Sequence, residues 1–123
     1  MATPNIRGAT GTINGNNGSL AVTSTAQSLV SNGSTTNALY KVNQIYISNV
    51  DTAAADEVTI TLRSSVSTTP TTATIAKNIS VPAKSTLEVL STPFYLREDQ
   101  DIQVVGMAAS GDLEAVATWE EIS

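Results

Sequence analysis

The chain has 123 residues and a formal net charge of −5, and it contains neither cysteine nor histidine. A domain of this size can bury a core without disulfides, while the two missing residue types exclude thiolate metal sites, cysteine nucleophiles and histidine as a general base. The acidic balance argues against a nucleic-acid partner, because phosphate binding needs clustered lysine and arginine.

The composition favours β-structure. Threonine and serine account for 18 and 14 residues, and threonine suits a pleated, half-exposed surface. No window repeats apolar residues at the three- and four-residue spacing of a helix. Because only 4% of the residues are aromatic, the core must consist of valine, isoleucine, leucine and alanine, which favours a thin sandwich over a deep ligand cavity.

Residues 1–19 contain four of the seven glycines and only two sizeable apolar side chains, Ile6 and Ile13. Such a segment buries too little surface to fold by itself, so we predict a flexible N-terminal arm that orders on a partner. Its expected contact residues are Pro4, Ile6, Arg7 and Ile13. The glycine spacing matches neither of the common nucleotide-binding patterns, and no strand precedes it.

After the arm, residues 20–30 are expected to form one strand, which is bent, and residues 31–37 a loop with a tight turn at Asn32-Gly33. The strongest β-signal follows between Tyr40 and Leu62. In its second half Val58, Ile60 and Leu62 alternate with polar residues, which predicts one buried and one exposed face. In its first half apolar residues lie at both odd and even positions: Val42, Ile45, Tyr46, Ile47 and Val50. We expect a central strand there, covered on both sides or carrying a β-bulge, and a surface loop over residues 51–56.

The rest of the chain predicts shorter strands separated by turn signals. Residues 64–72 form a Ser- and Thr-rich tip with Pro70, and residues 72–79 a weakly amphipathic strand whose Lys77 suits a sheet edge. Further strands are expected at residues 85–90, 101–106 and 113–122, and Phe94, Tyr95 and Leu96 form a short apolar cluster. About seven or eight strands at this spacing predict a single antiparallel β-sandwich over residues 20–123, of the jelly-roll or immunoglobulin-like type.

Few side chains in the sequence are candidates for metal binding, catalysis or sugar binding. Glu98, Asp99 and Asp101 with Asp112 supply oxygen ligands for calcium, but their spacing is not that of an EF-hand, and a charged turn is the simpler interpretation. Pairs of carboxylates, including Asp56 with Glu57, would suit glycoside hydrolysis, but the chain has few aromatic residues for sugar subsites. Trp119 is expected in the core or at a subunit interface. We predict that the protein is not an enzyme and has no cofactor or metal.

The charge is unevenly distributed along the chain. All eleven acidic residues follow residue 50, so residues 1–50 carry +2 and residues 51–123 carry −7. One interpretation is that the front half meets an acidic neighbour, such as the back half of a second copy. The simpler alternative is a solvated acidic surface.

Four stretches carry a family resemblance: Val42–Asp51, Ile79–Leu87, Pro93–Leu96 and Leu113–Glu121. Together they resemble the small virion structural proteins of tailed bacteriophages, including cyanophages. The resemblance implies a capsid decoration or cement protein, a β-sandwich on the shell that is often a homotrimer. Its flexible terminus would clasp neighbouring subunits, with the major capsid protein or another virion protein as partner. Deleting residues 2–18 should then abolish particle binding without changing the melting temperature of the body.

Two alternatives to a decoration protein remain. A neck, tail or fibre-base component belongs to the same class, whereas an adhesin-like carbohydrate-binding module would use the tip at residues 64–72 and a nearby tyrosine. The N-terminal sequence lacks a basic region followed by an apolar run, and no stretch is long enough to span a membrane. We therefore expect synthesis in the host cytoplasm without a signal peptide, location in the virion and no membrane partner.

Overall fold

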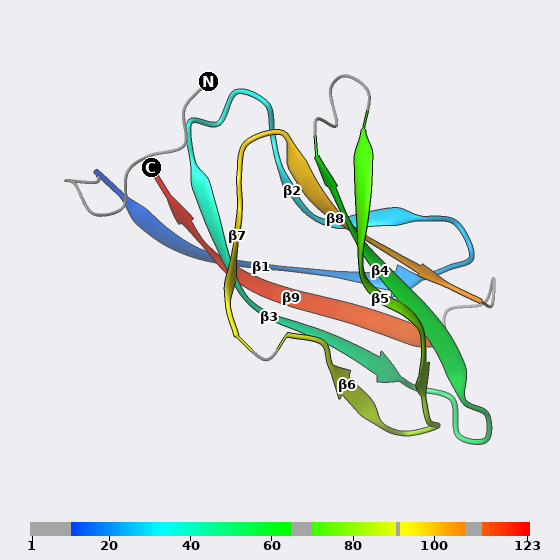
Figure 1. Cartoon of the computed structure of the whole chain (residues 1–123). Helices are drawn as coiled ribbons and strands as arrows, with labels where there is room; N and C mark the ends of the chain where they lie inside the picture. The colour runs from blue at the N-terminus through cyan, green and yellow to red at the C-terminus, as the bar shows by residue number, and fades with distance from the viewer. Residues whose placement is uncertain (1–10, 65–69, 91, 108–111) are drawn as a thin grey trace.

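Two antiparallel β-sheets pack face to face in the computed structural model, which describes residues 11–64, 70–90, 92–107 and 112–123 (Figure 1). Sheet A contains, in spatial order, β1 (Ile13–Val22), β9 (Leu113–Ile122), β3 (Leu39–Asn49) and β6 (Thr86–Glu88), with β7 (Phe94–Leu96) also paired to β3. Sheet B contains β2 (Gln27–Asn32), β8 (Gln100–Gly106), β4 (Asp56–Ser64) and β5 (Thr71–Val81). The predicted all-β sandwich is confirmed, and the described residues form nine strands where seven or eight were expected.

The strands pair in a nested order: β1 with β9, β2 with β8, β3 with β6 and β7, and β4 with β5. β6 and β7 pair with successive parts of β3, and Pro93, which cannot donate a ladder hydrogen bond, lies between them. Otherwise the chain changes sheet after every strand except at the β4–β5 hairpin. This nested order is that of a jelly roll, so the strand pairing decides between the two sandwich types that the sequence leaves open.

The core between the sheets is aliphatic, as the composition predicts. Its fully buried members include Ile45, Ile47, Ile60, Ile102 and Val104. The alternation in β4 is confirmed, because Val58 and Ile60 are buried and Leu62 packs against the core. Trp119 is 9% exposed and belongs to the same core.

A β-bulge explains why β3 has apolar residues at both odd and even positions. The pairing of β3 with β9 shifts between Val42 and Gln44, which leaves Asn43 as an extra residue. An extra residue reverses the side to which the following side chains point. Val42 is therefore buried in the same core as Ile45 and Ile47, and β3 is central in sheet A, as expected.

A buried asparagine ends β2. The sequence predicts a tight turn at Asn32-Gly33, but Asn32 is 1% exposed and begins the crossover from sheet B to sheet A. Its Nδ2 donates to the carbonyl oxygens of Ala38 (2.9 Å) and Leu96 (3.1 Å), and its Oδ1 accepts a hydrogen bond from Thr36. One amide thus satisfies groups from two distant segments, which a local turn rule does not anticipate.

A second buried asparagine ends β3 at the return crossover. Asn49 is 2% exposed, and its Nδ2 donates to the carbonyl oxygens of Ala54 (2.9 Å) and Val81 (2.8 Å). Its Oδ1 accepts from the backbone N–H of Asp51 at 2.9 Å. The loop that follows is exposed at residues 52–55, as predicted.

The N-terminal boundary differs from the prediction of an arm over residues 1–19. β1 begins at Ile13 and pairs with β9 up to Val22 without a register shift. The prediction is wrong for residues 13–19 because it counts buried side chains, whereas backbone hydrogen bonds to a neighbour also hold a strand. Residues 1–10 lie outside the described residues.

The single bent strand expected over residues 20–30 is in fact two strands. β1 ends at Val22 in sheet A, and β2 begins at Gln27 in sheet B. Residues 23–26 form the connection between the two sheets. Both strands carry apolar residues, Leu20 and Val22 in β1 and Leu29 and Val30 in β2, so the pattern alone does not reveal the change of sheet.

Candidate interaction surface

The acidic residues considered for calcium binding do not converge. Asp101 is fully buried in β8 and bonded to Arg63, whereas Asp112 precedes β9 in the other sheet. Glu98 accepts a hydrogen bond from the backbone N–H of Asn37 at 2.8 Å. Within the described ranges, no group of three or more His, Cys, Asp or Glu residues is placed to hold a metal ion.

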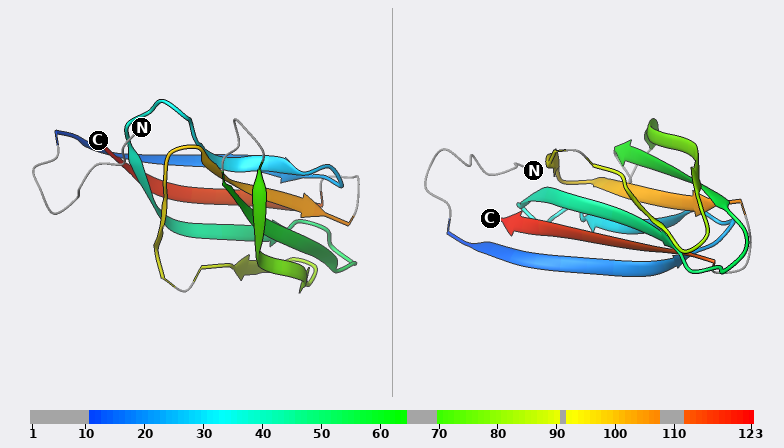
Figure 2. Two further views of the ribbon diagram at one scale, coloured as in Figure 1. Left: turned by 45° about the horizontal axis from the view of Figure 1, so that its top comes forward. Right: turned by 90° about the horizontal axis from the view of Figure 1, so that it is seen from below.

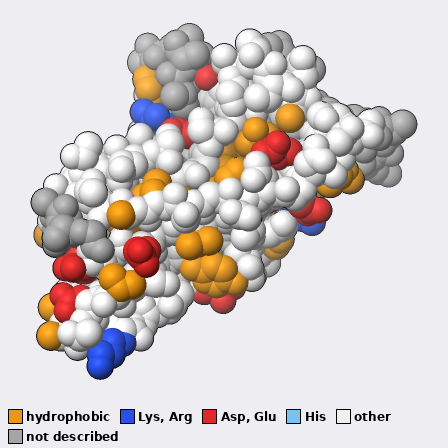
Figure 3. Space-filling view, turned by 180° about the vertical axis from the view of Figure 1, so that it is seen from behind, with side chains coloured by type: hydrophobic (Ala, Val, Ile, Leu, Met, Phe, Trp, Pro, Cys, Tyr) orange, Lys and Arg blue, Asp and Glu red, His pale blue; other side chains and the backbone are white. Residues whose placement is uncertain are grey.

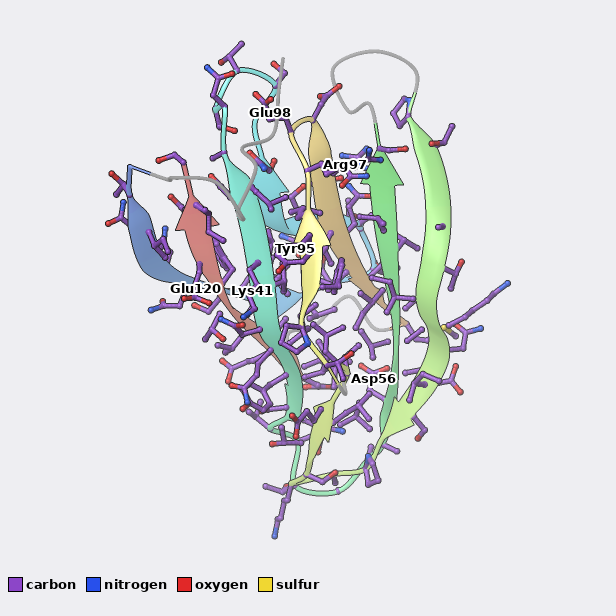
Figure 4. The ribbon with its side chains drawn as sticks, turned by 60° about the vertical axis from the view of Figure 1, so that its left-hand side comes forward. Lys41, Asp56, Tyr95, Arg97, Glu98 and Glu120 are labelled. Atoms are coloured by element: carbon purple, nitrogen blue, oxygen red, sulfur yellow. The ribbon has the colours of Figure 1, made fainter. Side chains whose placement is uncertain are left out.

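The carboxylates considered for glycoside hydrolysis are also separated. Asp56 and Glu57 are the first two residues of β4, so their side chains point to opposite faces of the strand. In the other group, Asp101 is buried and bonded to Arg63, and Glu98 accepts a hydrogen bond from Asn37. Figure 4 shows Asp56 and Glu98, one from each group, toward opposite ends of the molecule. Glycosidases need two carboxyl groups that flank one bond, and neither Asp56 with Glu57 nor Glu98 with Asp101 provides that geometry.

Arg63 and Asp101 form an ion pair that links β4 to β8. Arg63 Nε lies 2.9 Å from Asp101 Oδ1, and Nη2 lies 2.8 Å from Oδ2. Ser28 of β2 donates a further hydrogen bond to Oδ2, so the carboxylate ties three strands of sheet B together. The hydrogen bonds to Asp101 raise the pKa of Arg63. This structural role replaces the metal-ligand interpretation of Asp101, and sequence reasoning missed it because the partners are distant in the chain.

An aromatic cluster stands where β1, β9 and β3 meet. The rings of Tyr40 and Trp119 are stacked, with centroids 6.2 Å apart. Glu121 Oε2 accepts hydrogen bonds from Trp119 Nε1 and from Asn16 Nδ2, both at 3.0 Å. Burial and the nearby Glu121 carboxylate raise the pKa of Tyr40. The cluster fixes β1 against β9, and with Trp119 buried it offers no open stacking platform for a sugar.

The expected contact residues of the N-terminal segment are only partly described. Pro4, Ile6 and Arg7 lie outside the described residues, and their role stays a prediction. Ile13 is the first residue of β1 and is 58% exposed. β1 therefore begins with a large apolar side chain that is exposed.

β1 is an open edge of sheet A, and its hydrogen-bond pattern shows which groups are exposed. Thr12 and Ser123 exchange both backbone hydrogen bonds, at 3.1 and 2.9 Å. Along an antiparallel ladder such pairs alternate with pairs whose backbone groups point away. The backbone groups of five residues therefore point to the open side: Ile13, Gly15, Asn17, Ser19 and Ala21. In agreement, the N–H of Asn17 donates to the side-chain Oδ1 of Asn16 and not to β9.

The other sheet edges are interrupted. β2 has six residues and a register shift, while β6 and β7 have three residues each. β5 is an edge strand, as predicted, but two register shifts and a positive φ at Asn78 break it. Because of these irregularities, the alternation predicted for residues 73–79 is not observed. Ile75 and Ala76 both pack on the core, whereas Ile79 is exposed. Among the described strands, β1 alone is a long, unbroken edge.

The outer face of sheet A joins the front and back halves of the chain. Lys41 of β3 lies 3.9 Å from Glu120 of β9, with Tyr95 of β7 beside them (Figure 4). The suggested contact of the basic front half with an acidic back half is thus made within one chain. A groove of about 330 Å³ also lies between β1 and β9, and it is lined by Ser19, Leu20, Ala21, Glu114, Ala115 and Val116.

The described residues on one side of the molecule form no single dominant apolar patch. Figure 3, which shows the side opposite to Figure 1, has its apolar side chains in several separate groups. Two further views show β1 as the margin of sheet A, with no other described strand beyond it (Figure 2). The edge of β1 is therefore the candidate interaction surface.

No helix among the described residues is long and apolar enough to cross a membrane. No protein-family model and no curated protein sequence matches this chain.

Proposed function

We propose that this chain is a non-enzymatic structural protein of a phage virion, and specifically a decoration or cement protein bound to the major capsid protein. The observation that carries the proposal is the open edge of β1. Such an edge binds an extended segment of another protein through its backbone groups. Jelly rolls are also a common architecture of viral capsid proteins, although this supports the proposal only at the level of the fold.

Residues 1–10 directly precede β1, so an arm that orders on a neighbouring subunit would extend from the same edge. Pro4, Ile6 and Arg7 are its proposed contacts, together with Ile13. A virion role needs no reaction, and the described acidic residues form no catalytic arrangement that we can identify. Glu120 and Asp101 both pair with bases of the same chain.

The decisive measurement is the copy number of this chain in purified phage particles, by quantitative mass spectrometry against the major capsid protein. A decoration protein is expected in hundreds of copies and in a simple ratio to the shell subunit. About a dozen copies would favour a neck, tail or fibre-base component instead. Absence from the particle would refute the virion proposal.

A carbohydrate-binding module is the proposal's alternative in a different class, because jelly rolls also occur in lectins. The tip of the β4–β5 hairpin, which such a module would use to bind sugars, lies partly outside the described residues. The most exposed tyrosine, Tyr95, is 45% exposed but lies in sheet A, whereas the tip belongs to sheet B. A glycan array tests this alternative, and specific binding there with no copies in the virion would favour it.

A further inference from the structure

The edge of β1 lacks the features that normally protect an edge strand. Its ten residues include no charged residue, no proline and no register shift. Long edges without these features pair with strands of other molecules. We propose that β1 pairs antiparallel with β1 of a second copy about a two-fold axis, so that the two A sheets become one continuous sheet.

The condition of the other sheet edges indicates that the partner of β1 is β1 of a second copy. A head-to-tail contact, such as an edge-paired trimer needs, would require a second usable edge on each chain. β2, β5, β6 and β7 are short or interrupted, as described above. Pairing between copies through edges can therefore use only β1 with β1, which is a two-fold contact.

The register that uses all five outward-pointing residues is symmetric about Asn17. In it Asn17 faces Asn17 of the second copy, Gly15 faces Ser19, and Ile13 faces Ala21. About ten backbone hydrogen bonds would form, since each of the five residues donates and accepts once in each copy. The Asn17 N–H would exchange its bond to Asn16 Oδ1 for one to the second copy.

The side chains fit this register. Ile13 is large and 58% exposed, and the register places it over Ala21 of the second copy. Ala21 lines the groove of about 330 Å³ together with Ser19 and Val116. The exposed isoleucine of each copy therefore fits the groove of the other, and the contact is self-complementary in size.

The net charge of −5 on each copy does not prevent this contact. The acidic residues nearest to the edge, Glu114, Glu120 and Glu121, lie on β9, one strand further in, and Glu121 accepts a hydrogen bond from Asn16 of β1. Across the new sheet the two β9 strands would be three strand spacings apart, about 14 Å. That separation exceeds the Debye length of about 8 Å at physiological ionic strength.

Cysteine cross-linking tests the register, because the natural chain has no cysteine. In Asn17→Cys the two new thiols would sit on Cα atoms about 5.5 Å apart, within the range of a disulfide. In the control Ile13→Cys the two thiols would lie about 27 Å apart, eight residues along the strand. Under mild oxidation we expect covalent dimers from Asn17→Cys and from the double variant Ile13→Cys/Ala21→Cys, but not from Ile13→Cys alone.

Light scattering and sedimentation over a concentration series test the pairing itself. We expect a reversible dimer of the full chain. Gly15→Pro should weaken it at least tenfold, because it removes an outward N–H that β9 does not use. Gly15→Ala is the control, since a Cβ at Gly15 would meet no atom within 4 Å. Melting curves must show that both variants remain folded.

Three results would overturn the inference: a monomer at every concentration up to about 1 mM, the range of very weak binding; an oligomer that a folded Gly15→Pro variant leaves unchanged; or equal cross-linking of Ile13→Cys and Asn17→Cys. The dimer would occupy the same β1 edge that the virion proposal assigns to another protein, so the two contacts would compete. The oligomeric state of the purified chain tests this inference, and the copy number in the particle tests the virion proposal.

Discussion

Gly18 lies beneath the indole of Trp119, and this close approach explains a glycine within β1. A Cβ added there would lie 3.1 Å from Cη2 and 3.3 Å from Cζ3 of Trp119, in a buried contact. Gly15 is on the same strand, but a Cβ there meets open space. The two glycines therefore look alike in the sequence and differ in the structure.

We predict that Gly18→Ala lowers the free energy of unfolding by about 1–3 kcal/mol, the usual cost of overpacking. Gly15→Ala should leave it unchanged or raise it by up to about 1 kcal/mol, because alanine loses less backbone entropy in a strand. Urea unfolding monitored by the fluorescence of the single tryptophan measures both. Equal effects of the two variants would contradict the packing of Gly18 on Trp119.

Tyr40 should make stability depend on alkaline pH. Burial, and then the Glu121 carboxylate, raise its pKa, so the folded protein favours the neutral phenol. This contribution to stability is complete below the pKa of an unfolded tyrosine, about 10, and is lost as the pH rises through the higher pKa of folded Tyr40. We expect the melting temperature to fall less steeply above about pH 10 in Tyr40→Phe than in the natural protein.

Tyr95→Phe serves as the control, since Tyr95 is 45% exposed. Thermal melts of the three proteins from neutral to alkaline pH give the comparison. The same alkaline slope in Tyr40→Phe and in the natural protein would show that the phenol of Tyr40 does not contribute.

Among the elements, the crossovers between the sheets depend on single asparagines. Asn49→Ala would leave the carbonyl oxygens of Ala54 and Val81 without their donor inside the protein. We predict a loss of roughly 1–3 kcal/mol in unfolding free energy, because the Val81 carbonyl is buried and an unsatisfied buried group costs about 1–3 kcal/mol, whereas Ala54 lies in the exposed loop. Asn14→Ala, at an exposed position of β1, should change it by less than about 0.5 kcal/mol. Chemical denaturation of both variants measures the difference.

The strand β1 changes the design of a truncation experiment. Deleting residues 2–18 would remove Ile13–Gly18 and with them six of the register pairs to β9. We predict that this deletion lowers the melting temperature by more than about 5 °C. Deleting residues 2–10 leaves β1 whole, so the melting temperature should stay the same while binding to phage particles is lost.

Calorimetry and a particle pull-down of both truncations test this. Full particle binding by a folded variant lacking residues 2–10 would exclude the N-terminal segment as the capsid contact. An unchanged melting temperature after deletion of residues 2–18 would contradict the role of β1 in the sandwich.

At the scale of the whole molecule, the jelly roll brings the first and the last described segments of the chain together. β1 lies beside β9, and Gly11 and Thr12 both donate to the carbonyl oxygen of Ser123, at 3.0 and 3.1 Å. The pairing of β3 with β9 also sets the front half beside the acidic back half, as in the Lys41–Glu120 contact. The fold therefore neutralises part of the charge asymmetry within one chain.

The fold class, the aliphatic core and most of the strands follow from local patterns in the amino-acid sequence. Val58 and Ile60 show why: alternation in a strand is a local property, and burial of one face follows from it directly. The last strand, Leu113–Ile122, was predicted with its observed ends for the same reason.

The jelly-roll order, the strand at residues 13–22 and the ion pair of Arg63 with Asp101 become visible only in the folded chain. Each of these depends on segments far apart in the chain. Arg63 and Asp101 are 38 residues apart, and the Asn16 amide meets Glu121 across 105 residues. The pattern of a segment predicts which of its side chains are buried. It does not predict which distant backbone group or charged side chain will pair with that segment. The open edge of β1 can be recognised only when the strand order of both sheets is known.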